Sequence, residues 1–348
     1  MKNIASTFVT NNIRHQQGFT LIELMISLVL GLLISAAVMQ VFLTSQRVDR
    51  IQTAASEIQD KAVFGLQAIE PQVRLANLGN DGVSINDITV NGGIVLTAGK
   101  FDSSYEADED SADDSASAST RSNVMTKNNL RSGFLTRSGD MATTGNTGNR
   151  WNGSLTNTGV SSDQLTIQYI NTTGRTLYDC EGEEVAPNAR VITRYFIKED
   201  SDKTKKDRKN LNLNCDAGRI IDNRFTDFAN KNSGQTIIEN IDQFNIRLGT
   251  QQSIPNGSKI SYQYADMTVA EYMALIGDKP PIVNIRIAVL ARSTANSPEA
   301  STESFEIFGS TQTLKTQTDA PKYLRRVYET NILLRNARIM RIIDSSAP

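Results

Sequence analysis

Few residues in this sequence have the type and spacing needed for catalysis or metal binding. The 348 residues include one histidine, His15, and two cysteines, Cys180 and Cys215. Neither cysteine belongs to a C-x-x-C pair, and there is no His cluster from which zinc ligands could be assembled. The sequence also lacks a G-x-S-x-G nucleophile elbow, a P-loop and a dinucleotide-binding fingerprint. We therefore expect neither an enzyme nor a bound metal or cofactor.

The charge balance argues against nucleic acid as a direct partner. The chain has 36 Lys and Arg against 38 Asp and Glu, which gives a formal net charge of −2. Nucleic-acid-binding domains are normally clearly basic. The hydrophobic content of 39% is that of an ordinary globular protein.

A long apolar run near the start of the chain contains a single ionisable residue, Glu23. The run extends from Phe19 to Leu43, and as a helix its last 20 residues span about 30 Å, the thickness of a bilayer's hydrocarbon core. It is longer than the apolar part of a secretory signal, and no small-residue cleavage site follows it. Lys2 and Arg14 precede it without any acid, so the positive-inside rule places this end in the cytoplasm and the bulk of the chain outside.

Glu23 requires an explanation, because an uncompensated charge in a bilayer costs about 3 kcal/mol or more. One reading is that Glu23 lies at the level of the headgroups and stays solvated. The other follows from the string QQGFTLIELM, which resembles the N-terminus of type IV prepilins. In that family, prepilin peptidase cleaves the leader after a glycine and N-methylates the new terminal Phe, and a Glu stands at the fifth mature position. Gly18, Phe19 and Glu23 match this pattern.

The resemblance implies that Glu23 acts in a filament. The amine of mature Phe19 remains cationic after methylation, and Glu23 of a neighbouring subunit can pair with it as the helices stagger. Removing one partner would leave a charge in an apolar core, which is costly. His15 would depart with the leader, and the loss of Lys2 and Arg14 would leave 34 basic against 38 acidic residues, a net charge of −4. His-dependent catalysis is then excluded.

Apolar residues continue beyond the membrane segment at steps of three and four. This spacing predicts one helix from about Thr20 to about Leu75, whose second half packs its apolar stripe on a globular domain. Pro71 is expected to kink or end the helix. The stripe consists of Val48, Ile51, Ala55, Ile58, Ala62, Leu66, Ile69 and Val73.

Strand patterns follow in the rest of the chain. Alternating apolar residues predict strands at 165–169, 191–197, 244–248, 283–291 and 323–334. The strand at 283–291 alternates strictly, which predicts one buried face. Thr268 and Glu271 match a T-x-x-E capping box, which predicts a short helix from about Val269. The predicted fold class is α+β of pilin type, with a long N-terminal helix packed on a mainly antiparallel sheet with long loops.

Four regions are therefore expected along the chain. They are a cleaved leader (1–18), the membrane and filament-core half of the helix (19–43), the amphipathic half (44–78) and an exported β-rich domain (79–348).

The two cysteines are expected to form a disulfide, because an exported domain folds in an oxidising compartment. Cys180 and Cys215 lie 35 residues apart, and closing a loop of this size is worth about 3 to 4 kcal/mol in the chain-entropy estimate. Two charged segments are expected to be solvated loops: an acidic cluster at 106–114, which lacks the glycine and terminal Glu of an EF-hand, and the lysine-rich segment 203–209. The polar region 102–163 that contains the acidic cluster is expected to be a long loop.

Several segments together resemble the PilW group of type IV pilus minor pilins. They are GFTLIELMISLVLGLLISAAV from Gly18, MTVAEYMAL from Met267, PPIVNIRIAVLARS from Pro280 and YLRRVYETNILLRN from Tyr323. The resemblance implies a minor pilin that primes pilus assembly with other minor pilins, at or near the tip, and supports twitching motility, adhesion and DNA uptake.

The resemblance also implies partners and a location. The partners are prepilin peptidase, other minor pilins, the major pilin and a tip adhesin. The location is the inner membrane with a periplasmic domain before assembly, and the extracellular pilus afterwards. Two alternatives remain open at this point: a J-type pseudopilin of a type II secretion system, and a ligand-binding module at the pilus tip.

Overall fold

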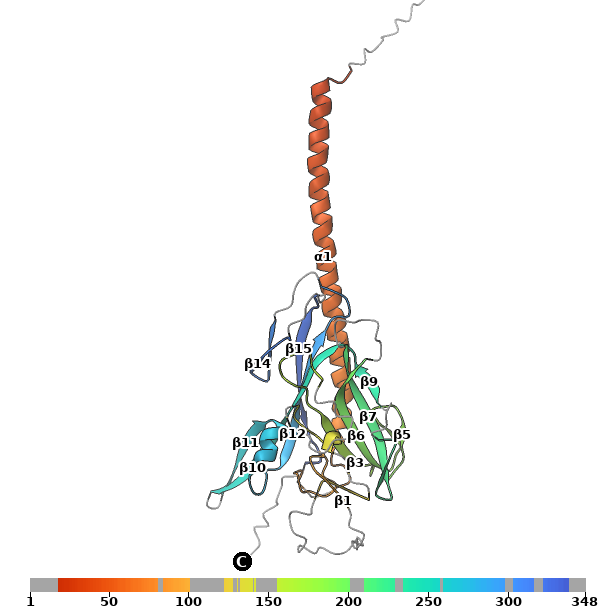
Figure 1. Ribbon diagram of the computed structural model, residues 1–348, viewed down its shortest axis with the longest axis vertical. Coiled ribbons are helices and arrows are strands. Elements are labelled where there is room, and N and C mark those ends of the chain that lie inside the picture. Colours follow the sequence, from red (N-terminus) through yellow and green to blue (C-terminus); the bar gives the residue numbers. More distant parts are fainter. Residues whose placement is uncertain are drawn as a thin grey trace, which may run out of the picture. The chain divides into compact units, whose positions relative to one another are not determined.

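The computed structural model describes residues 18–80, 84–100, 122–127, 130, 132–139, 141, 155–200, 210–228, 234–256, 259–297, 303–315 and 322–337. The chain divides into two compact units at the boundary between Arg50 and Ile51. Helix α1 (Leu21–Arg74) begins in the first unit and ends in the second (Figure 1). Three features of the sequence analysis lie outside the described residues: the acidic cluster at 106–114, the lysine-rich segment 203–209 and His15.

The long helix predicted from the sequence is confirmed within one residue at each end. Pro71 lies in its last turn, and α1 ends three residues later. From Ile58 onward the predicted stripe faces the core, because side chains at steps of three and four share one face of a helix, whereas Ile51 and Ala55 of the predicted stripe are only half-buried. The buried residues are Ala54, Ile58, Ala62, Gly65, Leu66, Ile69 and Val73.

Two antiparallel sheets provide the other walls of the main core. The first has the strand order β3-β6-β7-β8, with β9 also paired to β7. Its strands are β3 (Leu165–Ile170), β6 (Arg190–Glu199), β7 (Leu211–Ile221), β8 (Arg224–Thr226) and β9 (Gln235–Ile238). The second sheet has the order β11-β10-β12-β15. Its strands are β10 (Ile241–Asn256), β11 (Lys259–Met267), β12 (Ile282–Arg292) and β15 (Arg325–Leu333).

One hydrophobic cluster joins α1 to both sheets. Ile58 and Ile69 of α1 belong to the same buried cluster as Leu213 of β7 and Phe244 of β10. The five predicted strands correspond to β3, β6, β10, β12 and β15, and the α+β class is confirmed. Of the strands in these two sheets, β7, β8, β9 and β11 were not predicted from the sequence.

The capping box of the short helix is also confirmed. Helix α2 (Val269–Ala274) follows Thr268, whose side-chain oxygen accepts the N–H of Glu271 at 3.1 Å, while the Glu271 carboxylate accepts the N–H of Thr268 at 2.7 Å. The remaining short elements are β1 (Ala98–Lys100), β2 (Val124–Thr126), η2 (Ser132–Phe134), β4 (Leu177–Tyr178), β5 (Glu184–Val185), β13 (Ser304–Ile307) and β14 (Ser310–Thr313).

The prediction that the strand at 283–291 has one buried face is wrong for its second half. Ala288 and Leu290, which lie on the face predicted to be exposed, are both buried. Phe305 and Ile307 of β13 pack on them. The β13–β14 hairpin therefore covers the outer face of β12, which local alternation within β12 cannot reveal.

The expectation that the polar region 102–163 is one solvated loop is also wrong in part. Val124 and Phe134 pack in a second hydrophobic cluster with Ile192 of β6. Asn123 is buried, and both polar atoms of its side-chain amide are hydrogen-bonded. Oδ1 accepts the N–H of Leu96 at 2.9 Å, and Nδ2 donates to the carbonyl of Thr89 at 3.0 Å. Polar residues of this region are buried because their side chains are hydrogen-bonded. The polar composition of the region therefore gave a wrong prediction of solvent exposure.

A buried carboxylate joins the second sheet to a preceding loop. Asp242 at the start of β10 is fully buried, and its oxygens lie 2.5 Å from Arg325 Nε and 3.4 Å from Arg292 Nε. Asn157 Nδ2 also donates to Asp242 at 2.7 Å. Buried charges persist when they are paired in this way, so this group fixes the ends of three strands against one another.

Candidate functional site

The residues around the predicted cleavage position lie at the exposed start of α1. A Cβ added to Gly18 would meet no atom within 4 Å, and Phe19 is 88% exposed. The peptide bond between them is thus accessible within the described part of the chain. The cleavage itself stays a prediction.

Thr20 and Glu23 form a second capping box. Thr20 N–H and Thr20 Oγ1–H both donate to Glu23 Oε2, at 3.0 and 2.9 Å, and Glu23 N–H donates to Thr20 Oγ1 at 3.3 Å. This reciprocal arrangement satisfies backbone donors that have no partner within a helix. Thr20 is not among the predicted site residues, although the T-x-x-E signature from Thr20 to Glu23 is the same one that identifies Thr268 and Glu271.

Only one of the two oxygens of the Glu23 carboxylate takes part in this cap. Both donors bind Oε2, and Oε1 accepts no hydrogen bond from the residues that the structure describes. The cap fixes the orientation of the carboxylate, because two donors hold one of its oxygens. The other oxygen remains accessible to a cationic group outside the chain.

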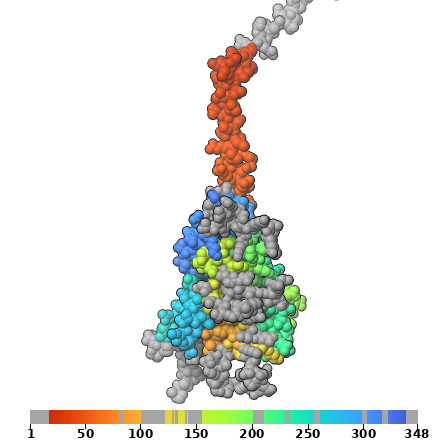
Figure 2. All heavy atoms as spheres, in the orientation of Figure 1, coloured from red at the N-terminus to blue at the C-terminus, as the bar shows by residue number. Residues whose placement is uncertain are grey.

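An apolar surface follows this carboxylate along α1. Every large hydrophobic side chain from Leu21 to Leu43 is exposed, and Figure 2 shows this stretch as an uncovered column. Among the described residues, α1 is the helix long and apolar enough to cross a membrane by length and composition. Such a surface is stable only in lipid or against other apolar helices.

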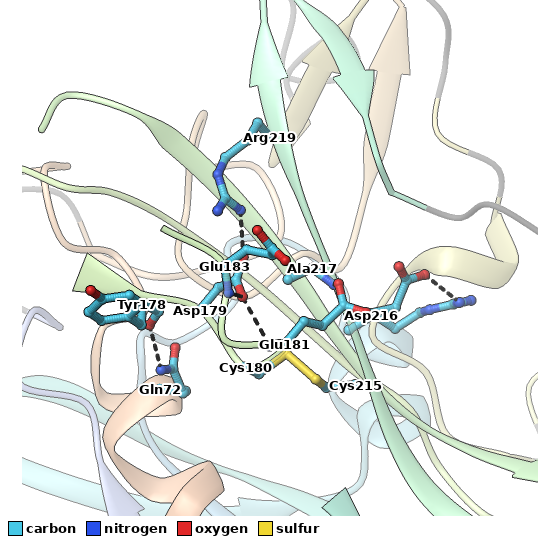
Figure 3. Close-up of a disulfide and its surroundings, with 11 residues drawn as sticks. Gln72, Tyr178, Asp179, Cys180, Glu181, Glu183, Cys215, Asp216, Ala217 and Arg219 are labelled. Carbon is cyan, nitrogen blue, oxygen red and sulfur yellow. Dashed lines mark hydrogen bonds and ion pairs between the residues drawn. A yellow bond between two sulfur atoms is a disulfide. The ribbon is translucent and has the colours of Figure 1, made fainter. Parts of the chain in front are cut away.

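The predicted disulfide between Cys180 and Cys215 is present, with 6.3 Å between the two Cα atoms. Cys180 lies between β4 and β5, and Cys215 lies in β7, fully buried in the main core (Figure 3). Near it, Gln72 Nε2 of α1 donates to the carbonyl of Tyr178 at 2.9 Å. The disulfide therefore ties a segment that contacts α1 to the central strand of the first sheet.

Acidic side chains surround this disulfide. The Asp179 carboxylate accepts the N–H groups of Glu181 and Glu183 at 3.0 Å and pairs with Arg219 at 2.8 Å. Glu181 Oε2 accepts the N–H of Ala217 at 3.0 Å (Figure 3). Burial raises the pKa of Glu181, the charges of Asp216 and Asp179 raise it further, and the hydrogen bond from Ala217 acts in the opposite direction.

This raised pKa predicts a pH-dependent stability. A carboxyl whose folded pKa exceeds its unfolded value binds more protons when folded, so stability falls as pH rises through that interval. Glu181→Gln is expected to remove this decrease, because an amide keeps the acceptor for Ala217 without the charge. Thermal melting between about pH 4 and pH 8 measures the effect. Glu183→Gln, at a neighbouring exposed residue, is the control, and an unchanged pH dependence in Glu181→Gln would contradict this assignment.

The structure brings the predicted site residues together as two groups. Gly18, Phe19 and Glu23 form one, and Cys180 and Cys215 the other. Among the described residues no cluster of three or more His, Cys, Asp or Glu side chains could hold a metal ion.

These features define a type IV pilin-like protein. They are an apolar helix with a Thr20–Glu23 capping box at its start, and an α+β domain with a disulfide at its other end. Residues 13–39 match the model of the prokaryotic N-terminal methylation motif. Residues 194–336 match the model of the family described as Type IV Pilus-assembly protein W. Over these two ranges the chain is similar to type IV pilins and to the PilW family, and the resemblance noted in the sequence is confirmed.

One solved structure that resembles the chain is a type IV-like pilin from Thermus thermophilus, with 11% identity and a TM-score of 0.29 over 51% of this chain and 80% of that one. A TM-score this low supports no argument about fold or function. No curated protein matches the chain in sequence.

The methylation motif and the family carry two implications. They imply processing by prepilin peptidase and pilin partners. The apolar helix and the motif also fit membrane anchoring and a place in a pilus.

Proposed function

We propose that this protein primes type IV pilus assembly as a structural subunit, in a complex with other minor pilins at or near the pilus tip. The observation that carries the proposal is the Glu23 carboxylate, oriented by Thr20 through one oxygen and open at the other, at the head of an exposed apolar helix. A subunit of this design stacks with others through its helix. It has no need of a catalytic group.

The proposal includes the processing steps and the four-region organisation expected from the sequence. Prepilin peptidase cleaves between Gly18 and Phe19 and methylates the Phe19 amine, and residues 19–43 anchor the chain in the inner membrane. The domain from residue 79 onward then lies in the periplasm before assembly and outside the cell afterwards. A tip adhesin is a further proposed partner, and adhesion, twitching motility and DNA uptake are the proposed outputs.

The charge of Phe19 gives the stacking its specificity. A cationic terminus inside a bundle of apolar helices needs a carboxylate partner, since an unpaired buried charge costs about 3 to 5 kcal/mol. Glu23 Oε1 is the acceptor that the cap leaves for this purpose. A neighbouring minor or major pilin therefore enters the stack by presenting its own amine to Glu23.

Deletion of the encoding gene tests the proposal against the type II secretion alternative. We expect loss of surface pili, seen by electron microscopy and by shearing, with unchanged secretion of exoproteins. Restoration of pili by the wild-type chain is the control. Normal piliation together with lost secretion would establish the J-type pseudopilin role instead.

Co-purification separates the assembly role from a tip ligand-binding module. The full chain solubilised in detergent is expected to co-purify with other minor pilins. Tight binding of DNA or glycans by the same preparation, without any pilin partner, would overturn the assembly role.

A further inference from the structure

The second sheet ends in an exposed edge strand, β11. The strand order is β11-β10-β12-β15, and in the part of the chain that the structure describes β11 pairs with β10 alone. Figure 1 shows β11 at the margin of the domain. Every residue from Ser261 to Asp266 is exposed, with Tyr262 at 50% and Tyr264 at 68%. The strand is therefore open to solvent on both faces and along its outer edge.

The register shows which backbone groups of β11 point outward. The N–H of Gln251 donates to the carbonyl of Pro281 at 2.9 Å, on the β12 side of β10. Gln251 and its partner Tyr264 therefore form a pair that exchanges no hydrogen bonds. Such pairs recur at every second position of an antiparallel ladder, so Tyr262 belongs to another of them. The N–H and C=O groups of Tyr262 and Tyr264 thus point away from β10, about 7 Å apart.

The other edges of the two large sheets are protected. At β3, the N–H of Gln168 donates to the carbonyl of Gly93 at 2.9 Å, so a preceding segment covers that edge. At the opposite edge of the same sheet, β8 and β9 have only three and four residues. The outer strand β15 carries the exposed charged residues Arg326 and Glu329. Covered, short and charged edges are the usual means by which proteins prevent strand addition.

The edge strand β11 has none of these protections among the described residues. It is nine residues long, its register with β10 is continuous, and it contains no proline. The residues from Ser261 to Ala265 are all uncharged. A long, neutral edge with unpaired N–H and C=O groups is a template for pairing with another strand.

The side chains of β11 indicate which strand fits. Tyr262 and Tyr264 lie on one face of the strand, and Ser261 and Gln263 lie on the other. The Tyr264 ring is held in place because its hydroxyl accepts a hydrogen bond from Gln251 Nε2 at 2.9 Å. Tyrosine pairs favourably across strands with aromatic and β-branched residues. The complementary ligand therefore has such side chains at every second position and polar side chains between them.

We propose that β11 binds an extended segment of a partner protein by strand addition, through the outward N–H and C=O groups of Tyr262 and Tyr264. The two tyrosine rings then pair with apolar side chains of the added strand, and the main-chain hydrogen bonds supply the affinity. A peptide strand matches this edge because it presents its own donors and acceptors at the same repeat. The surface is separate from α1, so the proposal does not depend on helix stacking.

Amide hydrogen exchange of the full chain in detergent tests the proposal. The probe is a synthetic peptide of sequence KTVTYTVTK, which alternates as the edge requires and is kept soluble by its terminal lysines. The chain is isotope-labelled at tyrosine, so that the amides of Tyr262 and Tyr264 are observed directly. The peptide is expected to slow their exchange about tenfold when the edge is about nine-tenths occupied, because both N–H groups become hydrogen-bonded.

A backbone-modified peptide is the matched control for the ligand. N-methylation of every second residue, at the positions whose N–H groups meet β11, keeps all side chains and removes the donors. This peptide is expected to give no protection. Equal protection by the two peptides would overturn the proposal, because binding would then not use the main chain.

Two variants of Tyr262 give the matched test on the protein. Tyr262→Pro removes an outward N–H without removing a hydrogen bond to β10, and edge strands tolerate proline in this orientation. It is expected to weaken peptide binding at least about tenfold, because a donor is lost and the proline ring obstructs the added strand. Tyr262→Ala keeps the N–H and loses one cross-strand pair, so binding should weaken only about twofold to fivefold. Fluorescence anisotropy of a labelled peptide measures both.

Two further results would overturn the proposal. One is equal binding by the wild-type chain and Tyr262→Pro. The other is self-association of the full chain that Tyr262→Pro abolishes, which would assign the edge to a second copy. Thermal melting shows whether Tyr262→Pro is folded, and if it is not, the comparison of the two peptides on the wild-type chain decides the matter.

Discussion

Glu23→Ala is expected to leave leader cleavage intact and to abolish incorporation of the protein into pili. Cleavage is expected to depend on Gly18 and Phe19, which the substitution leaves unchanged. Incorporation is expected to fail because the Phe19 amine of a neighbouring subunit would lose its carboxylate partner in the apolar stack, at a cost of about 3 to 5 kcal/mol. Immunoblotting of sheared pili against whole cells measures incorporation, and the mass of the protein reports cleavage.

A conservative variant separates the two roles of Glu23. Glu23→Gln keeps an oxygen that can accept the N–H and O–H groups of Thr20 but removes the charge. Thr20→Ala removes the hydroxyl and keeps the charge, and loss of a cap costs only about 0.5 to 2 kcal/mol. We expect Glu23→Gln to fail in incorporation and Thr20→Ala to be mildly impaired. Wild-type incorporation of Glu23→Gln would show that capping is sufficient and that charge pairing is not required.

Loss of the disulfide is expected to have the largest effect on stability. Replacing both Cys180 and Cys215 by Ser should lower the free energy of unfolding by about 3 to 4 kcal/mol, because the loop of 35 residues is no longer closed in the unfolded chain. Cys215 is also fully buried in the main core, so a serine hydroxyl there adds a desolvation cost. Thermal or denaturant melting of the full chain in detergent measures the loss.

A reductant provides the matched control for this prediction. Reduction should lower the melting temperature of the wild-type chain toward that of the double variant and leave the double variant unchanged. If the double variant melts within about 2 °C of the oxidised wild type, a shift that corresponds to about 1 kcal/mol for a domain of this size, the disulfide contributes less to stability than the loop-closure argument requires.

The sequence predicted the elements whose pattern is local. The helix from Leu21 to Arg74 follows from apolar residues at steps of three and four. The strands β3, β6, β10, β12 and β15 follow from alternation, and α2 from its capping box. In each of these cases the residues that determine the element lie within the element.

The features that were missed depend on partners distant in sequence. Leu211, Leu213 and Cys215 alternate with Asn in the first half of β7, a local pattern too short to show that the strand continues to Ile221, and the second half is held by its pairing with β6. Burial of Ala288 and Leu290 depends on the β13–β14 hairpin that follows. Asn123 is buried by hydrogen bonds to the segment 86–97, which composition cannot predict.

The candidate site was predicted in outline, and its detail came from the structure. Glu23 was assigned from the prepilin pattern, and the two cysteines were paired from the expected compartment. The orientation of the carboxylate by Thr20 and the acidic environment of Cys180 required coordinates. The close approach of β9 to α1 at Gly65 required them too, because Gly65 and Ile238 come from distant parts of the chain.

The contacts at the C-terminal end of α1 determine how the domain bears tension. Gln72 binds the carbonyl of Tyr178, two residues before Cys180, and Asn336 binds the carbonyls of Arg74 and Ala76. A pull along the helix axis therefore loads both sheets in parallel, the first through β4 and the disulfide and the second through the end of β15. Detaching α1 also requires the hydrophobic cluster that joins it to both sheets to separate, and the covalent link between Cys180 and Cys215 limits how far the first sheet can be drawn out. The domain thereby holds its helix through both sheets at once.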